Sequence, residues 1–449
     1  MKRKILSDNK KILMISLGCD KNLVDSEKML GLLSDNGYEF TDDENEADAV
    51  IVNTCCFIND AKQESIDNIL QMAELRKHGK LRALIVTGCL AERYREEIQK
   101  EIPEVDEIVG TTAIDKIVSS LNEIFEGQNK NHYADLQELP LKDGRRIVTT
   151  GGHYAYLKIA EGCDKRCSYC IIPKIRGSYR SVPIESLIRE AEKLAGGGVQ
   201  ELILVAQETT VYGTDLYGHK CLPELLHKLC RIEGFKWIRI LYCYPEEIDD
   251  ELIGTIASEP KICHYLDLPI QHASDRILKS MGRRTSKADL VSIIKKLREQ
   301  IPDICLRTTL ITGFPGETEK EHEELMEFVK SERFDRLGVF TYSREDDTPA
   351  ASFPDQVRSQ TKKRRQRQLM ELQQKIAFDK AASLVGTKLD AIVEGRITED
   401  DVTVARTYRD APGVDGLLFV RSDHEYLTGD LIKVTITGSD EYDLIGEIE

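Results

Sequence analysis

Hydrophobic and polar positions in the first third of the chain alternate between two kinds of segment. Short runs rich in β-branched residues cover residues 11–18, 47–55, 82–89 and 107–111. Amphipathic helical patterns lie between them, for example at residues 22–34 and 60–76. Strands that alternate with helices form a parallel sheet covered by helices. We therefore predict an N-terminal α/β domain with a parallel sheet over residues 1–125.

The same alternation returns after a polar, irregular stretch at residues 126–150, which we interpret as a linker. Six further strand candidates follow, at residues 153–160, 201–206, 236–242, 264–270, 304–311 and 336–342. Helical segments separate them, as at residues 183–195 and 285–300. Six βα units are fewer than the eight that close a full barrel, so we predict a central partial (β/α)6 barrel over residues 151–380.

The pattern changes a third time near Gly386. A charged helix at about residues 355–384 leads into five short strands with Gly and Asp turns, which favour a small antiparallel β-barrel of OB-like type. We predict this domain over residues 381–449. It contains 15 acidic and six basic residues, so it carries nine of the 16 net negative charges of the chain.

Composition narrows the class of protein. Hydrophobic residues make up 41% and charged residues 31% of the 449 residues, which excludes a disordered or fibrous chain. No apolar run approaches the ~18 residues of a membrane span, and no apolar segment follows the basic start MKRKILSDNK. We therefore expect a cytoplasmic protein with no membrane partner. Twelve cysteines in such a chain favour metal or redox chemistry over disulfides.

The most specific motif is EGCDKRCSYC, in which three and two residues separate Cys163, Cys167 and Cys170. Three thiolates can hold three irons of a 4Fe–4S cube and leave the fourth iron open. A zinc ribbon or chance spacing is the alternative, but zinc usually takes four ligands and the immediate loop has no fourth Cys or His. The loop follows the first strand of the predicted partial barrel, at the end where barrel sites form.

A second triad consists of Cys19, Cys55 and Cys89, each at the carboxyl end of a predicted strand of the N-terminal domain. Carboxyl ends of parallel strands share one sheet edge, so the three thiolates can converge. The alternative is three core cysteines. Cys56 directly follows Cys55 and could compete with it for iron. The remaining cysteines show no ligand spacing: Cys221, Cys230, Cys243, Cys263 and Cys305.

The first motif, with Tyr169 before its third cysteine, resembles that of the radical S-adenosylmethionine enzymes. The whole chain is similar to the methylthiotransferases of that superfamily, with an N-terminal domain, a radical core and a C-terminal TRAM domain. The resemblance implies S-adenosylmethionine and two 4Fe–4S clusters, the radical-generating one on Cys163, Cys167 and Cys170 and an auxiliary one on Cys19, Cys55 and Cys89. The first would cleave S-adenosylmethionine to a 5′-deoxyadenosyl radical, and the open iron of the second would carry the sulfur to be inserted.

The resemblance also implies a set of S-adenosylmethionine contacts in the loops and strands of the predicted barrel: Tyr169, Gly196, Gly197, Gln271, Arg307, Thr309, Ile311 and Gly313. The two adjacent glycines would accommodate the methionine part and the last four residues the adenosine. Alternatives stay open, because a glycine turn also simply ends a helix and LITGFPGET is a good strand–turn–helix junction. His272, beside Gln271, is as compatible with a core histidine as with a site residue. No protein acid or base is implied.

Two branches of the family differ in substrate. One modifies an isopentenylated adenosine in transfer RNA, and the other modifies the β-carbon of an aspartate of ribosomal protein S-twelve. Three segments resemble the second branch: SLGCDKNLVDSE at 16–27, NTCCFINDAKQESID at 53–67 and DAPGVDG at 410–416.

Charge supports the same choice. An acidic TRAM domain suits a basic ribosomal protein and would repel an RNA backbone. We therefore expect S-twelve as the partner, with no nucleic acid required for binding. The basic run KKRRQR at residues 362–367 is either a solvated helix face or an RNA contact. A non-catalytic metal-binding protein is the competing hypothesis from another class.

Overall fold

The computed structural model of the chain describes residues 10–79, 81–140 and 144–449. Residues 1–9, on which the signal-peptide argument depends, and residues 141–143 of the predicted linker lie outside the described residues. The chain divides into two compact units. The first comprises the chain up to Thr149 together with Lys158–Arg166 and Cys170–Leu187, and the second comprises Thr150–Leu157, Cys167–Tyr169 and Ile188–Glu449.

A five-stranded parallel sheet forms the centre of the first unit, with strand order β2-β1-β3-β4-β5. Its strands are β1 (Lys11–Ser16), β2 (Glu39–Phe40), β3 (Ala49–Thr54), β4 (Ala83–Thr87) and β5 (Glu107–Val109). The predicted N-terminal parallel α/β sheet is confirmed. The two-residue strand β2 is too short to produce an alternating pattern, so the sequence did not reveal it.

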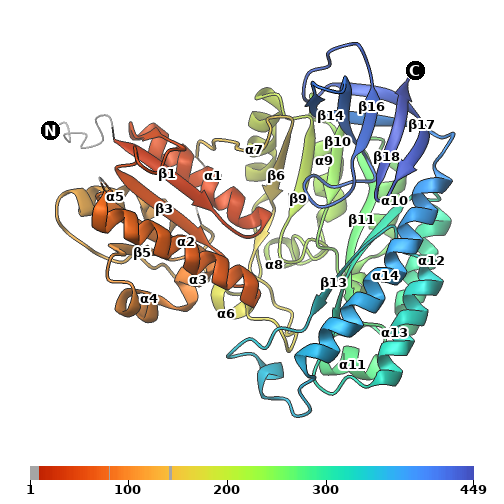
Figure 1. The fold of residues 1–449 in the computed structure, drawn as a ribbon, viewed down its shortest axis with the longest axis horizontal. Helices are drawn as coiled ribbons and strands as arrows, with labels where there is room; N and C mark the ends of the chain where they lie inside the picture. The colour runs from red at the N-terminus through yellow and green to blue at the C-terminus, as the bar shows by residue number, and fades with distance from the viewer. Residues whose placement is uncertain (1–9, 80, 141–143) are drawn as a thin grey trace. The chain divides into compact units, whose positions relative to one another are not determined.

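Helices cover both faces of this sheet, as Figure 1 shows. The helices are α1 (Asp20–Asp35), α2 (Asn59–His78), α3 (Gly88–Arg93), α4 (Arg95–Glu101), η1 (Ile114–Lys116) and α5 (Ile117–Phe125). Successive strand residues point to opposite faces: Ile51 packs with Met29 of α1 and Leu121 of α5, whereas Val52 packs with Ile69 of α2. The continuous apolar run in β3 therefore reflects burial on both sides.

Strand β7 (Ala160–Glu161) pairs antiparallel with β8 (Arg180–Ser181). This pairing closes the loop that connects the two strands. Helix α6 (Ile172–Arg176) lies within this loop. Its Ile175 and the preceding Ile171 pack into the same hydrophobic cluster as Val86 and Leu90. The segment that begins at Cys170 is thus anchored in the core of the first unit.

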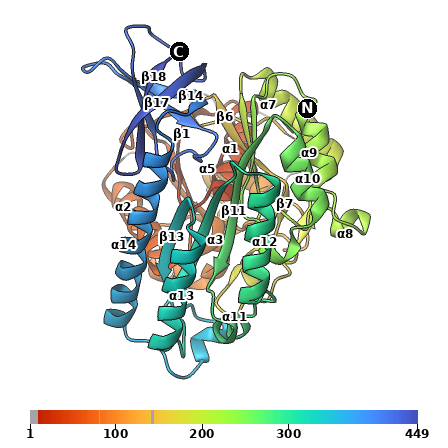
Figure 2. The same cartoon turned by 90° about the vertical axis from the view of Figure 1, so that its right-hand side faces the viewer.

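The second unit contains a six-stranded sheet, with strand order β13-β12-β11-β10-β9-β6. Its strands are β6 (Tyr154–Lys158), β9 (Glu201–Val205), β10 (Trp237–Ile240), β11 (Ile262–Gln271), β12 (Cys305–Thr312) and β13 (Arg336–Thr341). All six predicted strands are present, and the open sheet confirms the central partial barrel. Figure 2 shows α12 and α13 in front of this sheet.

The helical segments of the second unit connect these strands. They are α7 (Ile184–Gly196), α8 (Thr214–Tyr217), α9 (Leu222–Cys230), η2 (Pro245–Glu247), α10 (Asp250–Ser258), α11 (Asp275–Ser280), α12 (Lys287–Gln300), α13 (Glu319–Glu332), η3 (Pro349–Ser352) and α14 (Ser359–Ser383). Among the described residues, none of the helices combines the length and apolar character needed to cross a bilayer.

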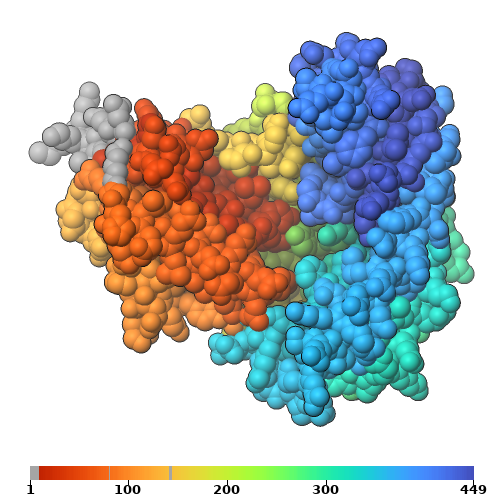
Figure 3. Space-filling view, viewed as in Figure 1, coloured from red at the N-terminus to blue at the C-terminus, as the bar shows by residue number. Residues whose placement is uncertain are grey.

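The C-terminal barrel is closed, with the order β14-β15-β16-β18-β17. Its strands are β14 (Lys388–Ile397), β15 (Val402–Thr407), β16 (Leu418–Arg421), β17 (Leu431–Asp440) and β18 (Asp443–Ile448). The predicted small barrel is confirmed, with one difference in pairing. Strands β16 and β18 run parallel, so the barrel is mixed rather than wholly antiparallel. In Figure 3 the dark-blue surface of the barrel adjoins the lighter blue surface of the residues that precede it in the chain.

The barrel contacts the amino ends of the sheet strands through buried ion pairs. Arg406 of β15 donates to Glu201, the first residue of β9, at 2.5 Å, and Arg239 donates to the same carboxylate at 2.7 Å. Asp410 pairs with Arg336, the first residue of β13. The DAPGVDG segment therefore covers the amino edge of the sheet. It does not cover the carboxyl edge, where ligands bind in α/β folds.

Candidate functional site

The N-terminal cysteine triad lies at the carboxyl edge of the first sheet. Cys19 immediately precedes α1, Cys55 immediately follows β3, and Cys89 is in the first turn of α3, directly after β4. Strands β1, β3 and β4 are neighbours in the sheet. The topology thus brings the three sequence-predicted thiols to one place.

Close contacts confine these thiols. A Cβ atom on Gly18 would lie 2.8 Å from Cys55 Sγ, and Gly18 has a φ of +88°, so only glycine fits before Cys19. Burial raises the pKa of Cys55 to about 12, with further contributions from the charges of Cys89 and Cys19. Thiolates here repel one another, and a bound cationic centre would relieve that repulsion. The residues present therefore fit a three-thiolate metal site.

Two asparagines hold the cysteine-bearing turns in place. Asn22 Nδ2 donates to the backbone oxygens of Leu17, at 3.1 Å, and Thr54, at 2.9 Å. Asn53 Nδ2 donates to the backbone oxygen of Asn22 at 2.8 Å. These bonds connect the turn before Cys19 with the turn before Cys55. Neither asparagine was predicted as a site residue, because a single amide in the first turn of α1 or near the end of β3 does not change the helical or strand pattern.

Cys56 occupies a different environment from Cys55. Its side chain is fully buried and belongs to the hydrophobic cluster that includes Val52 and Leu90. Burial raises the pKa of the Cys56 thiol well above its usual range. Cys55 is electrostatically coupled to Cys19, Cys89 and the cation of Arg176, whereas Cys56 is coupled to Cys89, Cys55 and the cation of Arg93. The coupling of Cys55 to both Cys19 and Cys89 supports Cys55 as the third thiolate.

Close backbone contacts also surround the start of the second cysteine motif. Cys163 and Cys170 belong to the first unit and Cys167 to the second. The Cys163 amide donates to the Gly177 carbonyl at 3.2 Å. A Cβ atom on Gly162, which has a φ of +75°, would lie 2.1 Å from the Ser178 carbonyl. The loop start is therefore pressed against residues 177–178, which explains the glycine in EGC.

In the second unit, Cys167 and its neighbours contact the segment after α11. The Ser168 amide donates to the Met281 carbonyl at 2.9 Å, and its hydroxyl donates to the Ser280 carbonyl at 2.8 Å. Cys167 Sγ lies 3.6 Å from the Tyr244 hydroxyl. The Arg283 guanidinium stacks over the Tyr244 ring at 4.1 Å.

Arg283 is a buried cation that sequence reasoning missed. Burial would lower the pKa of Arg283, but the anionic forms of Tyr169, Tyr244, Glu246 and Cys167 outweigh burial and raise it. Its Nε and Nη1 atoms have no hydrogen-bond partner among the described residues. Buried donors are nearly always satisfied, so these atoms are suited to an anionic ligand beside Cys167.

The predicted adenosine-side residues share one face of β12. Arg307, Thr309 and Ile311 are half-buried, whereas the residues between them are fully buried. Ile311 and Tyr169 pack against one cluster that contains Phe314. The structure thus brings Tyr169 and Ile311 together, while Arg307 lies nearer the amino end of the strand and donates to Asp267 at 3.1 Å.

Gln271 and Gly313 both lie at carboxyl ends of strands in left-handed conformations, with φ of +71° each. Gln271 ends β11, and its Oε1 is buried without a partner among the described residues. A non-glycine residue held in this conformation is typical of a functional site. Gly313 follows β12, and its amide donates to Glu317 Oε2 at 2.5 Å.

Gly196 and Gly197 lie apart from the other predicted contacts. Gly196 is the last residue of α7, and the glycine turn leads into the amino end of β9, whereas Gln271 and Gly313 follow the carboxyl ends of their strands. The Gly197 and Val199 amides bond back to Lys193 and Leu194 of the helix. This geometry matches the alternative that the glycines end a helix.

A carboxylate missed by the sequence reasoning occupies the carboxyl end of β9 instead. Glu208 follows that strand, is buried, and accepts a hydrogen bond from the Thr210 amide at 3.0 Å. The segment VAQET, directly after an apolar strand, was the available signal.

His272 is a core histidine in this structure. It is fully buried, and its Nδ1 accepts a hydrogen bond from the Ser274 amide at 2.9 Å. Burial lowers the pKa of His272 to about 3, so the ring is neutral at pH 7. Its Nδ1 contact supports the turn after Gln271, and its Nε2 is buried without a hydrogen-bond partner among the described residues.

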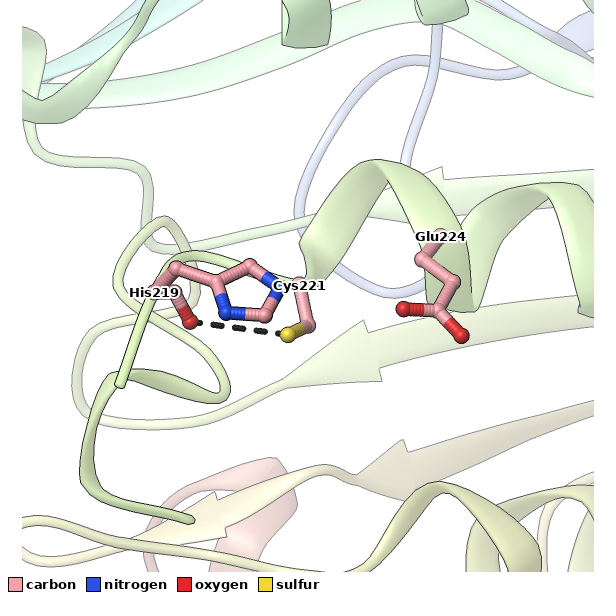
Figure 4. A group of neighbouring side chains, drawn as sticks. All are labelled: His219, Cys221 and Glu224. Atoms are coloured by element: carbon pink, nitrogen blue, oxygen red, sulfur yellow. Dashed lines mark hydrogen bonds between the residues drawn. The ribbon is translucent and has the colours of Figure 1, made fainter. Parts of the chain in front are cut away.

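Two other groups of metal-ligating side chains are found among the described residues. Figure 4 shows the first, in which the Cys221 thiol donates to the His219 carbonyl at 3.5 Å. His219 Nδ1 bonds to the Tyr217 carbonyl at 3.0 Å, and Glu224 pairs with Lys228 at 2.8 Å. Protein partners therefore account for this arrangement without a metal ion. The second group is an ion-pair cluster of Glu107, Glu123 and His132.

Three family models match consecutive parts of the chain. Residues 11–110 match "Uncharacterized protein family UPF0004", residues 157–329 match the "Radical SAM superfamily", and residues 385–448 match the "TRAM domain". The chain is 61% identical, over 98% of its length and all of the relative, to the ribosomal protein uS12 methylthiotransferase RimO of Lachnoclostridium phytofermentans. The chain belongs to the RimO family. RimO proteins of Clostridioides difficile and of a Thermoanaerobacter species are 50% and 48% identical over 98% of this chain, covering 98% and 100% of those relatives.

Solved structures agree with the RimO family assignment at the level of fold. The radical S-adenosylmethionine methyltransferase TsrM from Kitasatospora setae has a TM-score of 0.56 at 15% identity, covering 76% of this chain and 77% of TsrM. The cobalamin-dependent radical enzyme OxsB has a TM-score of 0.51 at 12% identity, covering 81% of this chain and 56% of OxsB. The family models and the RimO relatives make the chain a radical S-adenosylmethionine enzyme with a C-terminal TRAM domain.

Proposed function

We propose that this enzyme attaches a methylthio group to the β-carbon of an aspartate of ribosomal protein uS12, the S-twelve protein. The observation that carries the proposal is the convergence of Cys19, Cys55 and Cys89 at one sheet edge, in a chain similar to RimO relatives over 98% of its length. A radical enzyme that only cleaved S-adenosylmethionine would need no second thiolate triad.

The proposal assigns two 4Fe–4S clusters to the six predicted cysteines. Cys163, Cys167 and Cys170 would hold the radical-generating cluster, and Cys19, Cys55 and Cys89 the auxiliary one. When bound, these clusters and S-adenosylmethionine would supply a carbon radical that removes hydrogen from an unactivated C–H bond, and a methylated sulfur that replaces it. Acid–base chemistry is unsuited to this step, because the neighbouring carboxylate makes the aspartate β-proton very weakly acidic.

The side chains of the second unit would then bind and orient S-adenosylmethionine. The half-buried face of β12, with Thr309 and Ile311, and the Tyr169 ring would line the adenosine. Arg283 would offer its unpartnered N–H groups to an anionic group beside Cys167. Gln271, fixed in a left-handed conformation, would present its amide at the same sheet edge.

The acidic end of the barrel would bind the basic substrate protein. Exposed acidic residues gather on two loops, in the β14–β15 turn and after β16: Glu399, Asp400, Asp401, Asp423 and Glu425. The two loops are adjacent, because the Ser422 amide donates to the Asp401 carbonyl at 3.1 Å. Such a patch attracts a basic protein and repels nucleic acid, so we propose that binding requires no RNA and takes place in the cytoplasm.

The test is mass spectrometry of ribosomal protein uS12 from cells with and without this gene. The proposal expects an added methylthio group on one aspartate in the presence of the enzyme and none in its absence. Analysis of modified transfer-RNA nucleosides from the same cells provides the opposite test. Unmodified uS12 together with an enzyme-dependent methylthiolated adenosine would overturn the assignment of the substrate.

A further inference from the structure

Arg176 is a buried cation that contacts a thiol of the N-terminal triad. It is the last residue of α6, six positions after Cys170, and only 2% of its surface is exposed. Its Nε and Nη2 atoms each lie 3.4 Å from Cys89 Sγ. Nη2 also donates to Asn22 Oδ1 at 2.5 Å. One planar guanidinium therefore directs two donors at a single sulfur.

Two carboxylates hold the remaining part of this guanidinium. Arg176 Nη1 donates to Asp25 Oδ2 at 2.9 Å and to Glu161 Oε2 at 3.3 Å. Lys158, also buried, pairs with Asp25 and, at 2.8 Å, with Glu161. Two positive and two negative side chains balance one another here before any thiolate is counted.

The arginine stays charged in this setting. A guanidinium is not deprotonated in proteins, and Arg176 Nη1 pairs with both Asp25 and Glu161. Burying four charges contributes little to stability, because desolvation offsets the attraction between them. Packing of Ile171 and Ile175, rather than the ion pairs, anchors the helix. The position of Arg176 therefore calls for an explanation at the thiol.

We propose that Arg176 is a positioning residue of the auxiliary cluster site: it orients the Cys89 thiolate and raises the reduction potential of the cluster bound there. This inference rests on the proposed function, which assigns Cys19, Cys55 and Cys89 to that cluster. Hydrogen bonds to cluster sulfurs and a nearby cation both stabilise the more negative, reduced state. Arg176 supplies both from one side chain.

The test uses the full-length chain with Cys163, Cys167 and Cys170 changed to alanine, so that only the auxiliary cluster assembles. A redox titration followed by electron paramagnetic resonance measures its midpoint potential. Arg176→Met is expected to lower the midpoint, because the reduced cluster loses a cation and two N–H donors. Arg176→Lys is expected to shift it less, since the charge remains while the paired donors are lost.

Arg180→Met is the matched control. Arg180 is also a buried arginine of this segment, but it donates to the backbone carbonyls of Arg176, at 3.0 Å, and Ser178 rather than to sulfur. Its midpoint should equal that of the parent chain. If Arg176→Met does not fold, arginine labelled with ¹⁵N decides the matter: a hyperfine coupling from the guanidinium should appear in the parent and vanish in Arg176→Lys.

The outcomes separate the two levels of the claim. The parent chain could contain about four irons while all variants show the same midpoint and couplings. That result would overturn the role of Arg176 but would still support the auxiliary cluster. No cluster in the parent chain would overturn both this role and the proposed function. A lower midpoint in Arg180→Met equal to that in Arg176→Met would show a general effect of charge and refute a specific contact with sulfur.

Discussion

Three buried polar side chains lie in or beside the segments of this protein that carry the cysteines. Asn22, Arg176 and Arg283 are each buried or nearly so, and each satisfies or offers hydrogen bonds at a thiol-bearing turn. Cysteine spacing in the sequence revealed the thiols themselves. It could not reveal these neighbours, because a single asparagine or arginine has neither periodicity nor a motif of its own.

His272 provides a prediction about pH. Its pKa is about 3 in the folded protein and about 6.5 in the unfolded chain. As pH falls below about 6.5, the unfolded chain therefore binds a proton that the folded protein does not, and stability is lost until pH reaches about 3. At pH 5.5 the loss should be on the order of 1 kcal/mol relative to pH 7.5.

The measurement is urea unfolding of the wild type and of His272→Gln at pH 7.5 and 5.5. The free-energy difference between the two pH values should be smaller in the variant by about that amount. Charged groups that face the ring are included in both chains and cancel in the comparison: Glu317, Glu321, His322, Arg365 and Arg276. An identical pH dependence in the two chains would contradict a neutral buried His272.

At the scale of elements, alternation of strands and helices predicted both sheets. Ten strand candidates in residues 11–342 match strands of the structure to within a few residues. The same alternation placed the glycine turn at residues 196–198 between the predicted helix at residues 183–195 and the predicted strand at residues 201–206. The structure has the same order, with the turn between α7 and the amino end of β9.

Glycines before Cys19 and Cys89 offer a prediction about the turns of the triad. A Cβ atom on Gly88, which has a φ of +89°, would lie 2.3 Å from Asn53 Oδ1 and 2.5 Å from the Thr54 carbonyl. Gly88→Ala should therefore displace Cys89. Iron content should fall from about eight toward about four atoms per chain. The left-handed alanine should also lower the free energy of unfolding by roughly 1–2 kcal/mol.

Gly127→Ala is the matched control for that change. Gly127 has a φ of +79°, but a Cβ atom there would meet nothing within 4 Å. The Gly127→Ala variant should lose the same amount of unfolding free energy and keep its full iron content. Equal iron content in the two variants would show that the close approach at Gly88 is not needed for the metal site.

For the whole molecule, the sequence predicted three regions but not how the barrel connects with the second sheet. The DAPGVDG segment served as a substrate-branch signature in the sequence, yet its Asp410 and Asp415 bond to Arg336 and Tyr265 of the sheet. Ion pairs between residues so far apart in sequence leave no local pattern. The acidic character of the barrel, in contrast, was evident from composition.

Arg406→Met tests how firmly the barrel is joined to the sheet. The variant leaves Glu201 buried with Arg239 as its remaining partner, and losing one partner of a buried pair should cost ~3 kcal/mol. Arg421→Met, at an exposed barrel position, should stay within about 0.5 kcal/mol of wild type. Urea unfolding, with limited proteolysis as the readout, measures the free energy of unfolding of both variants. Equal stability of the two variants would argue against a tightly joined barrel.

The central claim is that two thiolate triads divide the chemistry. The most direct measurement counts 5′-deoxyadenosine and methylthiolated uS12 in parallel for Cys167→Ala and Cys89→Ala. We predict that Cys167→Ala forms neither product, whereas Cys89→Ala still forms 5′-deoxyadenosine but no methylthiolated protein. Equal loss of 5′-deoxyadenosine in both variants, or methylthiolation by Cys89→Ala, would contradict the account.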